Sequence, residues 1–255
     1  MEFTGTASYL TDPALETAVR CAVVLEKPLL VRGEPGTGKT LLAEAVAEAL
    51  GMDLITWNVK STTRAQEGLY TYDTVQRLYD SRFGDHDVRD ISDYIHLGPM
   101  GQAFSAEKRT VLLIDEIDRA DDEFEGFLLE LLSDFQVTIP ELGTIRAARP
   151  PIVVLTSNRT REIHDALKRR CLYHWVDYPD FAREIEILKA RAPEAAEALS
   201  REIVAFVQQL RTEDLFKKPG VAETIDWAKC LLALDVISLS PEVIADTLGA
   251  ILKYQ

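Results

Sequence analysis

Short apolar runs alternate with longer segments of helical periodicity over much of this chain of 255 residues. Short runs rich in Val, Ile and Leu are typical of buried strands, and the segments between them are typical of helices packed on a sheet. The alternation predicts a mostly parallel sheet with helices on both faces. We expect five strands, at residues 28–32, 54–59, 110–114, 152–156 and 171–176.

Capping residues and apolar spacing predict the helices that cover this sheet. Asp12 and Pro13 indicate a helix start, because Asp caps a free N–H and Pro lacks one. This first helix would turn Leu15, Val19 and Ala22 toward the core. A later helix is expected to bury apolar residues that recur three and four positions apart, namely Phe124, Phe127, Leu128, Leu131 and Leu132.

Two features follow that helix. Residues 136–147 predict a β-hairpin around Gly143, which serves either as a partner contact or as a plain connector. From residue 180 to the end the pattern is helical alone, and Ser240 with Pro241 starts a last helix whose apolar positions run on to Leu252. The chain is therefore expected to form two domains, an α/β core at residues 1–179 and a small helical domain at residues 180–255.

Residues 33–40 read GEPGTGKT, a complete GxxxxGKT phosphate loop. A predicted strand precedes it and a helical pattern follows it, and this context favours a phosphate loop over a plain Gly-rich turn. Glycines let successive backbone N–H groups face a phosphate, Lys39 reaches the β and γ groups, and the Thr40 hydroxyl binds Mg²⁺. The residues expected to contact the nucleotide here are Gly33, Glu34, Pro35, Gly36, Thr37, Gly38, Lys39, Thr40 and Leu41.

A second acidic element accompanies the loop. The run TVLLIDE at residues 110–116 predicts a strand that ends in two carboxylates. Asp115 would hold Mg²⁺ and Glu116 would polarise the attacking water, whereas the alternative is an acidic loop without a role in catalysis. Of the acidic residues that follow, most are expected to form a solvated face; they are Asp118, Asp121, Asp122, Glu123 and Glu125.

Five further residues, in three segments, are candidates for the same site. Asn158 ends the fourth predicted strand, where its amide either positions water beside the γ-phosphate or caps a turn. Arg169 and Arg170 precede the last strand, and one of them either neutralises transition-state charge in a neighbouring subunit or forms surface salt bridges. Tyr9 and Leu10 contact the base or pack in the core.

Composition narrows the partners. The formal net charge of −14 argues against nucleic acid or an anionic membrane as a partner, although a local basic groove is compatible with it. Three separated cysteines without a CxxC pair indicate buried free thiols. The N-terminus has no signal-like run and no apolar stretch is long enough to span a membrane, so we expect a cytoplasmic protein.

The order of these elements resembles the AAA+ ATPases over nearly the whole chain. The stretches EGLYTYDTVQRL, GPMGQAF, LLIDEIDRAD, VVLTSN and ALKRRC resemble the MoxR family in particular, and within it the branch that contains the ATPase assisting carbon monoxide dehydrogenase maturation. The resemblance implies a P-loop NTPase fold, with a five-stranded AAA+ core between helices and a C-terminal helical lid.

The same resemblance implies roles for single residues. Lys39 and Thr40 match Walker A, Asp115 and Glu116 match Walker B, and Asn158 matches sensor 1. Arg170 matches the arginine finger better than Arg169, whose position often carries an acidic residue in relatives. The implied activity is hydrolysis of ATP with Mg²⁺ by a homo-oligomeric ring, usually a hexamer. The implied partners are a protein with a von Willebrand factor A domain and a client metalloenzyme.

Two departures from the family pattern stand out. Where relatives carry a sensor 2 arginine, this chain reads KKPGVAETIDWAKC with Thr224 near the expected position, and Lys217 or Lys218 is the nearest substitute. The region after the second strand offers Gly68, Leu69, Tyr70 and Tyr72 in an order unlike a threading pore loop. The tyrosines are therefore expected in the core or in an insert.

The leading hypothesis is a MoxR-type ATPase that remodels or activates a partner protein in metalloenzyme maturation. One alternative is a nucleotide-gated binding module with slow hydrolysis, which the missing sensor 2 arginine favours. Another is a restriction-type GTPase or a DNA-directed AAA+ motor, because GEPGTGKT does not separate ATP from GTP.

Overall fold

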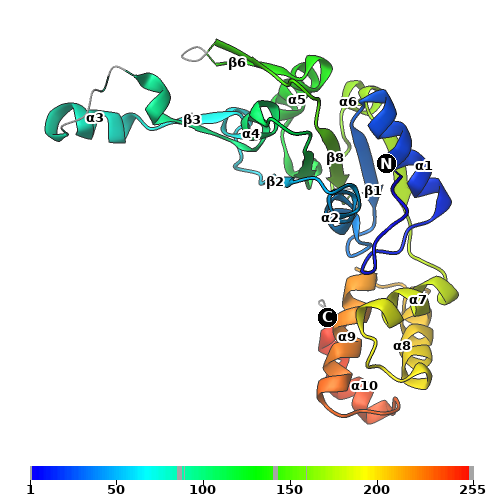
Figure 1. Ribbon diagram of the computed structural model, residues 1–255. Coiled ribbons are helices and arrows are strands. Elements are labelled where there is room, and N and C mark those ends of the chain that lie inside the picture. The colour runs from blue at the N-terminus through cyan, green and yellow to red at the C-terminus, as the bar shows by residue number, and fades with distance from the viewer. Residues whose placement is uncertain (1, 85–87, 89, 140–142, 159, 253–255) are drawn as a thin grey trace.

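The core of the protein is a sheet of five parallel strands in the order β2-β5-β8-β1-β9. Figure 1 labels β2, β8 and β1 of this sheet. The computed structural model describes residues 2–84, 88, 90–139, 143–158 and 160–252. The five predicted strands are confirmed, each with ends within one residue of the expected ones. They are β1 (Leu29–Gly33), β2 (Leu54–Asn58), β5 (Val111–Asp115), β8 (Ile152–Ser157) and β9 (Leu172–Val176).

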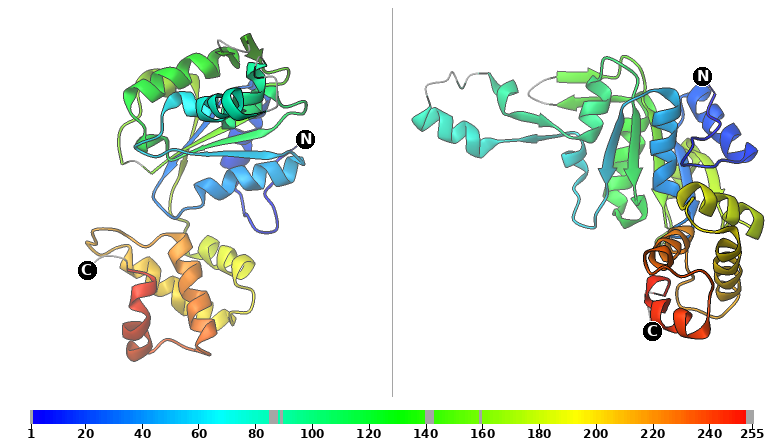
Figure 2. Two further views of the ribbon diagram at one scale, coloured as in Figure 1. Left: turned by 90° about the vertical axis from the view of Figure 1, so that its left-hand side faces the viewer. Right: turned by 60° about the horizontal axis from the view of Figure 1, so that its bottom comes forward.

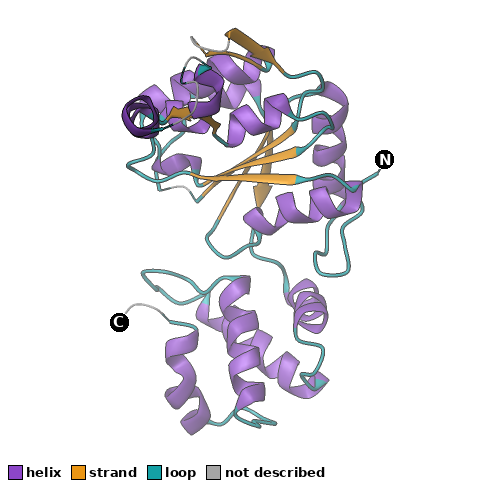
Figure 3. Ribbon diagram, turned by 60° about the vertical axis from the view of Figure 1, so that its left-hand side comes forward, coloured by secondary structure: helices purple, strands orange, loops and turns teal. Residues whose placement is uncertain are grey.

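Helices cover both faces of the sheet (Figure 3). On one face lie α1 (Pro13–Leu25) and α2 (Lys39–Leu50), and on the other lie α4 (Pro99–Ser105), α5 (Asp122–Asp134) and α6 (Asp165–Arg170). Asp12 Oδ1 caps α1 by accepting hydrogen bonds from two backbone N–H groups, and the predicted inward face of this helix is buried. The apolar face predicted for α5 is buried too, except for the half-buried Phe127.

An insert between β2 and β5 was not predicted from the apolar pattern. Its strands β3 (Tyr70–Tyr72) and β4 (Ile95–Leu97) pair antiparallel and carry α3 (Thr74–Phe83) away from the core (Figures 1 and 2). Short 3-10 turns flank them at Ala65–Gly68 and Ile91–Tyr94. No residue of α3 is buried, so its sequence carries no core-facing stripe. Tyr70 is buried and Tyr72 half-buried at the base of the insert, as expected.

The predicted hairpin is present as β6 (Gln136–Ile139) and β7 (Gly143–Arg146). The strands are antiparallel, with Val137 opposite Ile145. Gly143 begins β7 opposite Ile139, with a φ of 82°. The residues between the two strands, 140–142, lie outside the described part of the chain.

The C-terminal part is a separate group of helices below the sheet (Figure 2). It contains α7 (Phe181–Arg191), α8 (Glu197–Leu210), α9 (Val221–Ala233) and α10 (Pro241–Thr247) around an apolar core of its own. The predicted last helix is shorter than expected, because a 3-10 turn at Leu248–Ala250 follows α10. The predicted domain boundary at 179/180 falls in the loop before α7.

A buried ion pair ties three of these C-terminal helices together. Arg211 and Glu184 are both buried and form a bidentate contact of 2.7 Å. The Thr224 hydroxyl lies 2.8 Å from Glu184 Oε1. Because a buried charge without a partner is strongly unfavourable, this contact sets how α7, α8 and α9 pack.

Two expectations about the surface have different outcomes. Cys21 is exposed rather than buried, because it lies on the outer side of α1, while Cys171 and Cys230 are half-buried free thiols. Burial raises the pKa of the Cys171 thiol to about 12. Within the described ranges, no helix is both long and apolar enough to cross a membrane.

Candidate functional site

The loop at residues 33–40 connects the carboxyl end of β1 to the start of α2. Gly36 and Gly38 have φ values of 75° and 86°, in the left-handed region that favours glycine. Gly33 is needed for a different reason, because a Cβ there would lie 2.1 Å from the Val176 carbonyl oxygen of β9. The loop therefore has the backbone of an anion-binding concavity at a helix N-terminus.

Lys39 lies under this loop with only 5% of its surface exposed. Its Nζ donates hydrogen bonds of 3.0 Å to the Gly33 carbonyl and 2.6 Å to the Glu34 carbonyl. Burial lowers the pKa of Lys39 to about 8, although nearby carboxylates, Asp118 first among them, oppose the shift. A buried ammonium held by neutral carbonyls is a ready counter-charge for an anion in the loop.

Asp115 ends β5 opposite the loop. The Thr40 hydroxyl donates to its carboxylate at 3.1 Å, and the Thr156 hydroxyl of β8 donates to the same carboxylate. Thr156 also accepts a 2.9 Å hydrogen bond from the Glu116 N–H. Hydroxyl and carboxylate oxygens are the donors that Mg²⁺ prefers, so Thr40 and Asp115 fit a magnesium ion bound beside a phosphate.

Glu116 follows directly and adopts the left-handed conformation, with a φ of 57°. Its Oε1 accepts a 3.0 Å hydrogen bond from the Asn158 side-chain amide. Its Oε2 forms a 2.8 Å ion pair with Arg119, one turn further along the chain. A non-glycine residue keeps such an unfavourable backbone conformation only where its neighbours stabilise it. Here this conformation directs the Glu116 carboxylate toward Asn158.

A cleft of about 1060 Å³ opens between the sheet edge, the N-terminal segment and the C-terminal helices. Tyr9 and Leu10 line it, as do residues 35–41, Glu116 and Asn158. Burial raises the pKa of the Tyr9 hydroxyl far above its usual range. Asp115 does not line the cleft itself but is hydrogen-bonded to Thr40, which does. Gly33 and Glu34 do not line it either, and their carbonyls accept hydrogen bonds from Lys39.

Arg169 and Arg170 are not brought into this cleft. Both are exposed on α6, and Arg170 Nη1 donates a 2.9 Å hydrogen bond to the Leu129 carbonyl of α5. Neither residue is among those that line the described cleft. Any contact of these guanidinium groups with a bound nucleotide would therefore need a second copy of the chain.

The N-terminus of α9 contacts the phosphate loop directly. The Ala222 N–H donates to the Gly36 carbonyl at 3.0 Å, and a Cβ on Gly36 would lie 2.7 Å from Glu223 Oε2. Thr224, which the sequence placed near the sensor 2 position, instead points into the helical domain toward Glu184. Lys217 lines the cleft, and Lys218 is not among the lining residues.

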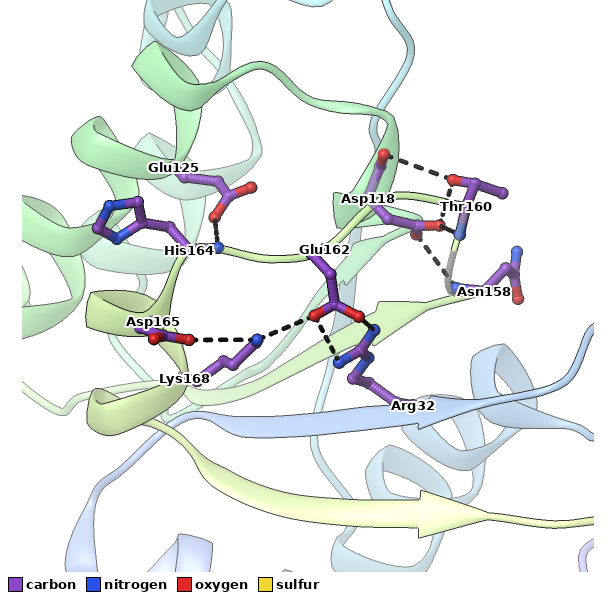
Figure 4. A network of polar contacts seen from close by, with 9 residues as sticks. All are labelled: Arg32, Asp118, Glu125, Asn158, Thr160, Glu162, His164, Asp165 and Lys168. Carbon is purple, nitrogen blue, oxygen red and sulfur yellow. Dashed lines mark hydrogen bonds and ion pairs between the residues drawn. The ribbon is translucent and has the colours of Figure 1, made fainter.

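Two of the acidic residues after Glu116 are not solvated. Asp121, Asp122 and Glu123 are exposed as expected, but Asp118 and Glu125 are 4% and 1% exposed. Both accept hydrogen bonds from the segment that follows β8 (Figure 4). Burial alone would raise the pKa of Asp118, but the hydrogen bonds from Thr160 and Asn158 outweigh it and lower the pKa.

Sequence reasoning thus missed several residues of the site. Thr156, Arg119 and Glu223 lie inside recognised stretches but were given no role. The sheet order brings Thr156 to Asp115 and Glu116, Arg119 pairs with Glu116 three residues before it, and the docking of α9 brings Glu223 to the cleft. Glu125 did have a signal, because it lies three and seven positions before the buried Leu128 and Leu132 and so shares their helix face.

Comparison with known proteins agrees with this geometry. The family model for the "ATPase family associated with various cellular activities (AAA)" matches residues 29–175. An uncharacterized protein of Staphylococcus haemolyticus is 28% identical over 239 residues, 91% of this chain and 86% of its own. Another, from Staphylococcus epidermidis, is 28% identical over 225 residues, 85% of this chain and 80% of its own.

Among solved structures, the RuvB Holliday junction branch migration motor of Thermotoga maritima is similar in fold. Its TM-score is 0.53 at 19% identity, and the match covers 92% of this chain and 66% of that chain. The chain therefore spans slightly less than two thirds of the length of this structure, and the likeness is one of fold alone.

Thr156 provides a test of the site's architecture. Thr156→Val keeps the shape of the side chain but leaves the half-buried Glu116 N–H without its acceptor, so we expect a loss of about 1–3 kcal/mol in unfolding free energy. Thr156→Ser retains the hydroxyl and should lose less than half of that. Denaturant unfolding of the three proteins measures the difference, and equal losses in both variants would contradict a role for the hydroxyl.

Proposed function

The chain belongs to the AAA family of ATPases, and on that basis we propose that it is a MoxR-type ATPase that uses Mg-ATP hydrolysis to remodel or activate a partner protein. Its fold is the expected AAA+ P-loop fold. The observation that carries the proposal is the meeting of Glu116 and Asn158 with the buried Lys39 and the Thr40–Asp115 pair at one edge of the sheet.

Each group has a distinct task in this proposal. The loop amides and Lys39 bind the triphosphate tail, and Thr40 with Asp115 holds Mg²⁺, which neutralises charge on the phosphates. Glu116 accepts a proton from the attacking water, and the Asn158 amide keeps that carboxylate aimed. Tyr9 and Leu10 enclose the base at the far end of the cleft. Arg170 of a neighbouring copy supplies the arginine finger.

The proposed assembly follows from where the arginines lie. AAA+ ATPases commonly act as oligomeric rings, and a ring brings α6 of one copy toward the cleft of the next. We propose a homo-oligomer, hexameric by resemblance to MoxR. Its partners would be a protein with a von Willebrand factor A domain and a client metalloenzyme of the molybdenum hydroxylase type. This part of the proposal rests on the motif resemblance alone.

A second candidate is a nucleotide-gated binding module that hydrolyses ATP slowly. The N-terminus of α9 favours it, because there a carboxylate, Glu223, lies against the phosphate loop, and Thr224 stands near the position where the MoxR resemblance implies an arginine. Steady-state ATPase rates with and without a candidate partner discriminate the two, since strong stimulation by the partner excludes incidental hydrolysis. A competition assay with GTP tests nucleotide preference in the same preparation.

A DNA-directed motor is less compatible with the chain. RuvB is a branch migration motor, but the likeness to it is one of fold, and tracking along DNA requires clustered basic groups. The net charge of −14 opposes such contacts.

Glu116→Gln tests the general base. Glutamine keeps the hydrogen bond to Asn158 but cannot accept a proton, so we expect kcat to fall about 10²–10⁴-fold while ATP affinity stays within a few fold. Phosphate release and calorimetry measure the two quantities. Glu123→Gln, on the exposed start of α5, is the matched control and should keep the wild-type rate. Normal turnover of Glu116→Gln would end its assignment.

Lys39 gives a pH dependence. Burial lowers its pKa to about 8, so above that pH the free protein must take up a proton before the ammonium can bind a phosphate. We expect affinity for a non-hydrolysable ATP analogue to fall with rising pH above 8, by at most about tenfold per pH unit. Lys39→Met should bind weakly and show a flat profile over this range. Parallel profiles for the two proteins would contradict the role of this proton.

Arg170→Ala tests the shared site. The variant should bind ATP normally but hydrolyse it about 10³-fold more slowly or worse. An equal mixture with Lys39→Ala subunits should regain activity, because about a quarter of its sites then join an intact cleft to an intact arginine. Phosphate release after co-assembly, verified by light scattering, measures the gain. Absence of any gain in verified mixed rings would contradict a finger acting between subunits.

A further inference from the structure

Hydrogen bonds join two segments that follow the neighbouring strands β5 and β8 (Figure 4). Residues 116–125 follow β5, and residues 158 and 160–164 follow β8 and lead into α6. Carboxylates of the first segment accept hydrogen bonds from the second at three successive levels, through Asp118, Asp122 and Glu125. The first segment begins at the candidate general base, and the second ends at the helix that carries Arg170.

The first level lies at the cleft. Asp118 accepts hydrogen bonds from the backbone N–H of Asn158 at 3.1 Å and of Thr160 at 2.8 Å. These bonds hold the backbone of Asn158 while its side chain reaches Glu116 at 3.0 Å. Asp118 therefore acts on the cleft of its own chain.

The last level lies at the start of α6. Glu125 is 1% exposed, and its Oε2 accepts a 2.6 Å hydrogen bond from the His164 N–H. Its Oε1 pairs with Arg161, which also binds Asp122 at 2.8 Å. His164 is the N-cap of α6, and its Nδ1 accepts a hydrogen bond from the Ala166 N–H. A buried carboxylate thus fixes the residue from which α6 begins.

The same helix, α5, also holds the other end of α6. Leu129 lies one turn after Glu125, and its carbonyl accepts the 2.9 Å hydrogen bond from Arg170. Between the two contacts, Leu167 of α6 is fully buried in the core against α5. Contacts with α5 therefore set the direction of α6. They also set where the side chains of Arg169 and Arg170 lie on the surface.

We propose that Glu125 is a positioning residue that fixes α6 so that Arg170 reaches the nucleotide cleft of a second copy of this chain. The inference rests on the proposed function, which places Arg170 in a neighbour's site. Burying a carboxylate is unfavourable unless it is fully paired, and its pairing here with a backbone N–H and a guanidinium selects one orientation of the helix. Glu125 touches no nucleotide itself and acts through His164 and α6.

The test uses whole-chain variants and subunit mixing. Glu125→Ala leaves the His164 N–H and Arg161 without their partner, and a misplacement of about 1 Å in a reacting group lowers rates by about 10²-fold. We expect that loss in kcat, with KM for ATP within about threefold of wild type because the cleft is intact. If Glu125→Ala does not fold, Glu125→Gln keeps the acceptor for His164 but loses the charge toward Arg161, and should show a smaller loss of the same kind.

Mixing separates action in the neighbour's site from action in the chain's own. Glu125→Ala subunits, mixed with inactive Lys39→Ala subunits, should regain activity to the level of the Arg170→Ala mixture, because the Lys39→Ala neighbour supplies a correctly held arginine. Asp118→Asn is the matched comparison, since its defect lies in its own cleft and the same mixing should restore nothing. Glu123→Gln controls for loss of an acidic side chain on α5.

The outcomes are distinguishable. If the Arg170→Ala mixture gains activity and the Glu125 mixture does not, the finger stands and the role of Glu125 is overturned. If neither mixture gains activity, the proposal that Arg170 acts in a neighbouring subunit is contradicted, and the positioning role of Glu125 is contradicted with it. Wild-type turnover in both Glu125 variants would also overturn it, because α6 would then be held without this carboxylate.

Discussion

The whole site depends on one constraint, which is that all strands of a parallel sheet end at the same edge. β8 follows β1 and β5 in the chain but lies between them in the sheet, so the ends of β1 and β5 are two strand spacings apart, about 10 Å. Lys39 and Thr40 reach into this gap from α2, and Thr156 occupies the strand between. The sheet order thus converts three separate segments into one set of groups suited to a triphosphate and a divalent ion.

Among the residues that the structure describes, the buried carboxylates lie at junctions between segments rather than in the apolar layers. Asp118 and Glu125 join the segment after β5 to the segment after β8, and Glu184 with Arg211 joins three helices of the C-terminal domain. Removing such groups from water is unfavourable, and apolar contacts could fill the same volume. What an apolar contact cannot supply is direction, because a carboxylate accepts hydrogen bonds only along certain lines. These pairs therefore define orientation where two elements must meet in one way.

The strands and the phosphate loop could be predicted because each produces a strong local pattern: a continuous apolar run at β1, β5 and β8, and four spaced residues in GEPGTGKT. The insert could not, because β3 and β4 are only three residues long and α3 buries nothing that would impose periodicity. The role of Thr156 could not be predicted for a different reason. Its hydroxyl bonds to residues at the end of the neighbouring strand β5, and no pattern in its own segment indicates that contact. The acidic run after Glu116 was interpreted by composition, whereas helical spacing would have separated the buried Glu125 from the exposed Glu123.

The contact between α9 and the phosphate loop adds a constraint on how the cleft responds to its ligand. Glu223 packs against Gly36, and the Ala222 N–H is bonded to the carbonyl of the same glycine. A triphosphate in the loop would bring negative charge toward that carboxylate. Arg183, Lys217 and Lys229 line the same cleft, so the C-terminal helices present both signs of charge to it. At the loop itself α9 presents a carboxylate, whereas a lid that offers an arginine to the γ-phosphate presents the opposite charge.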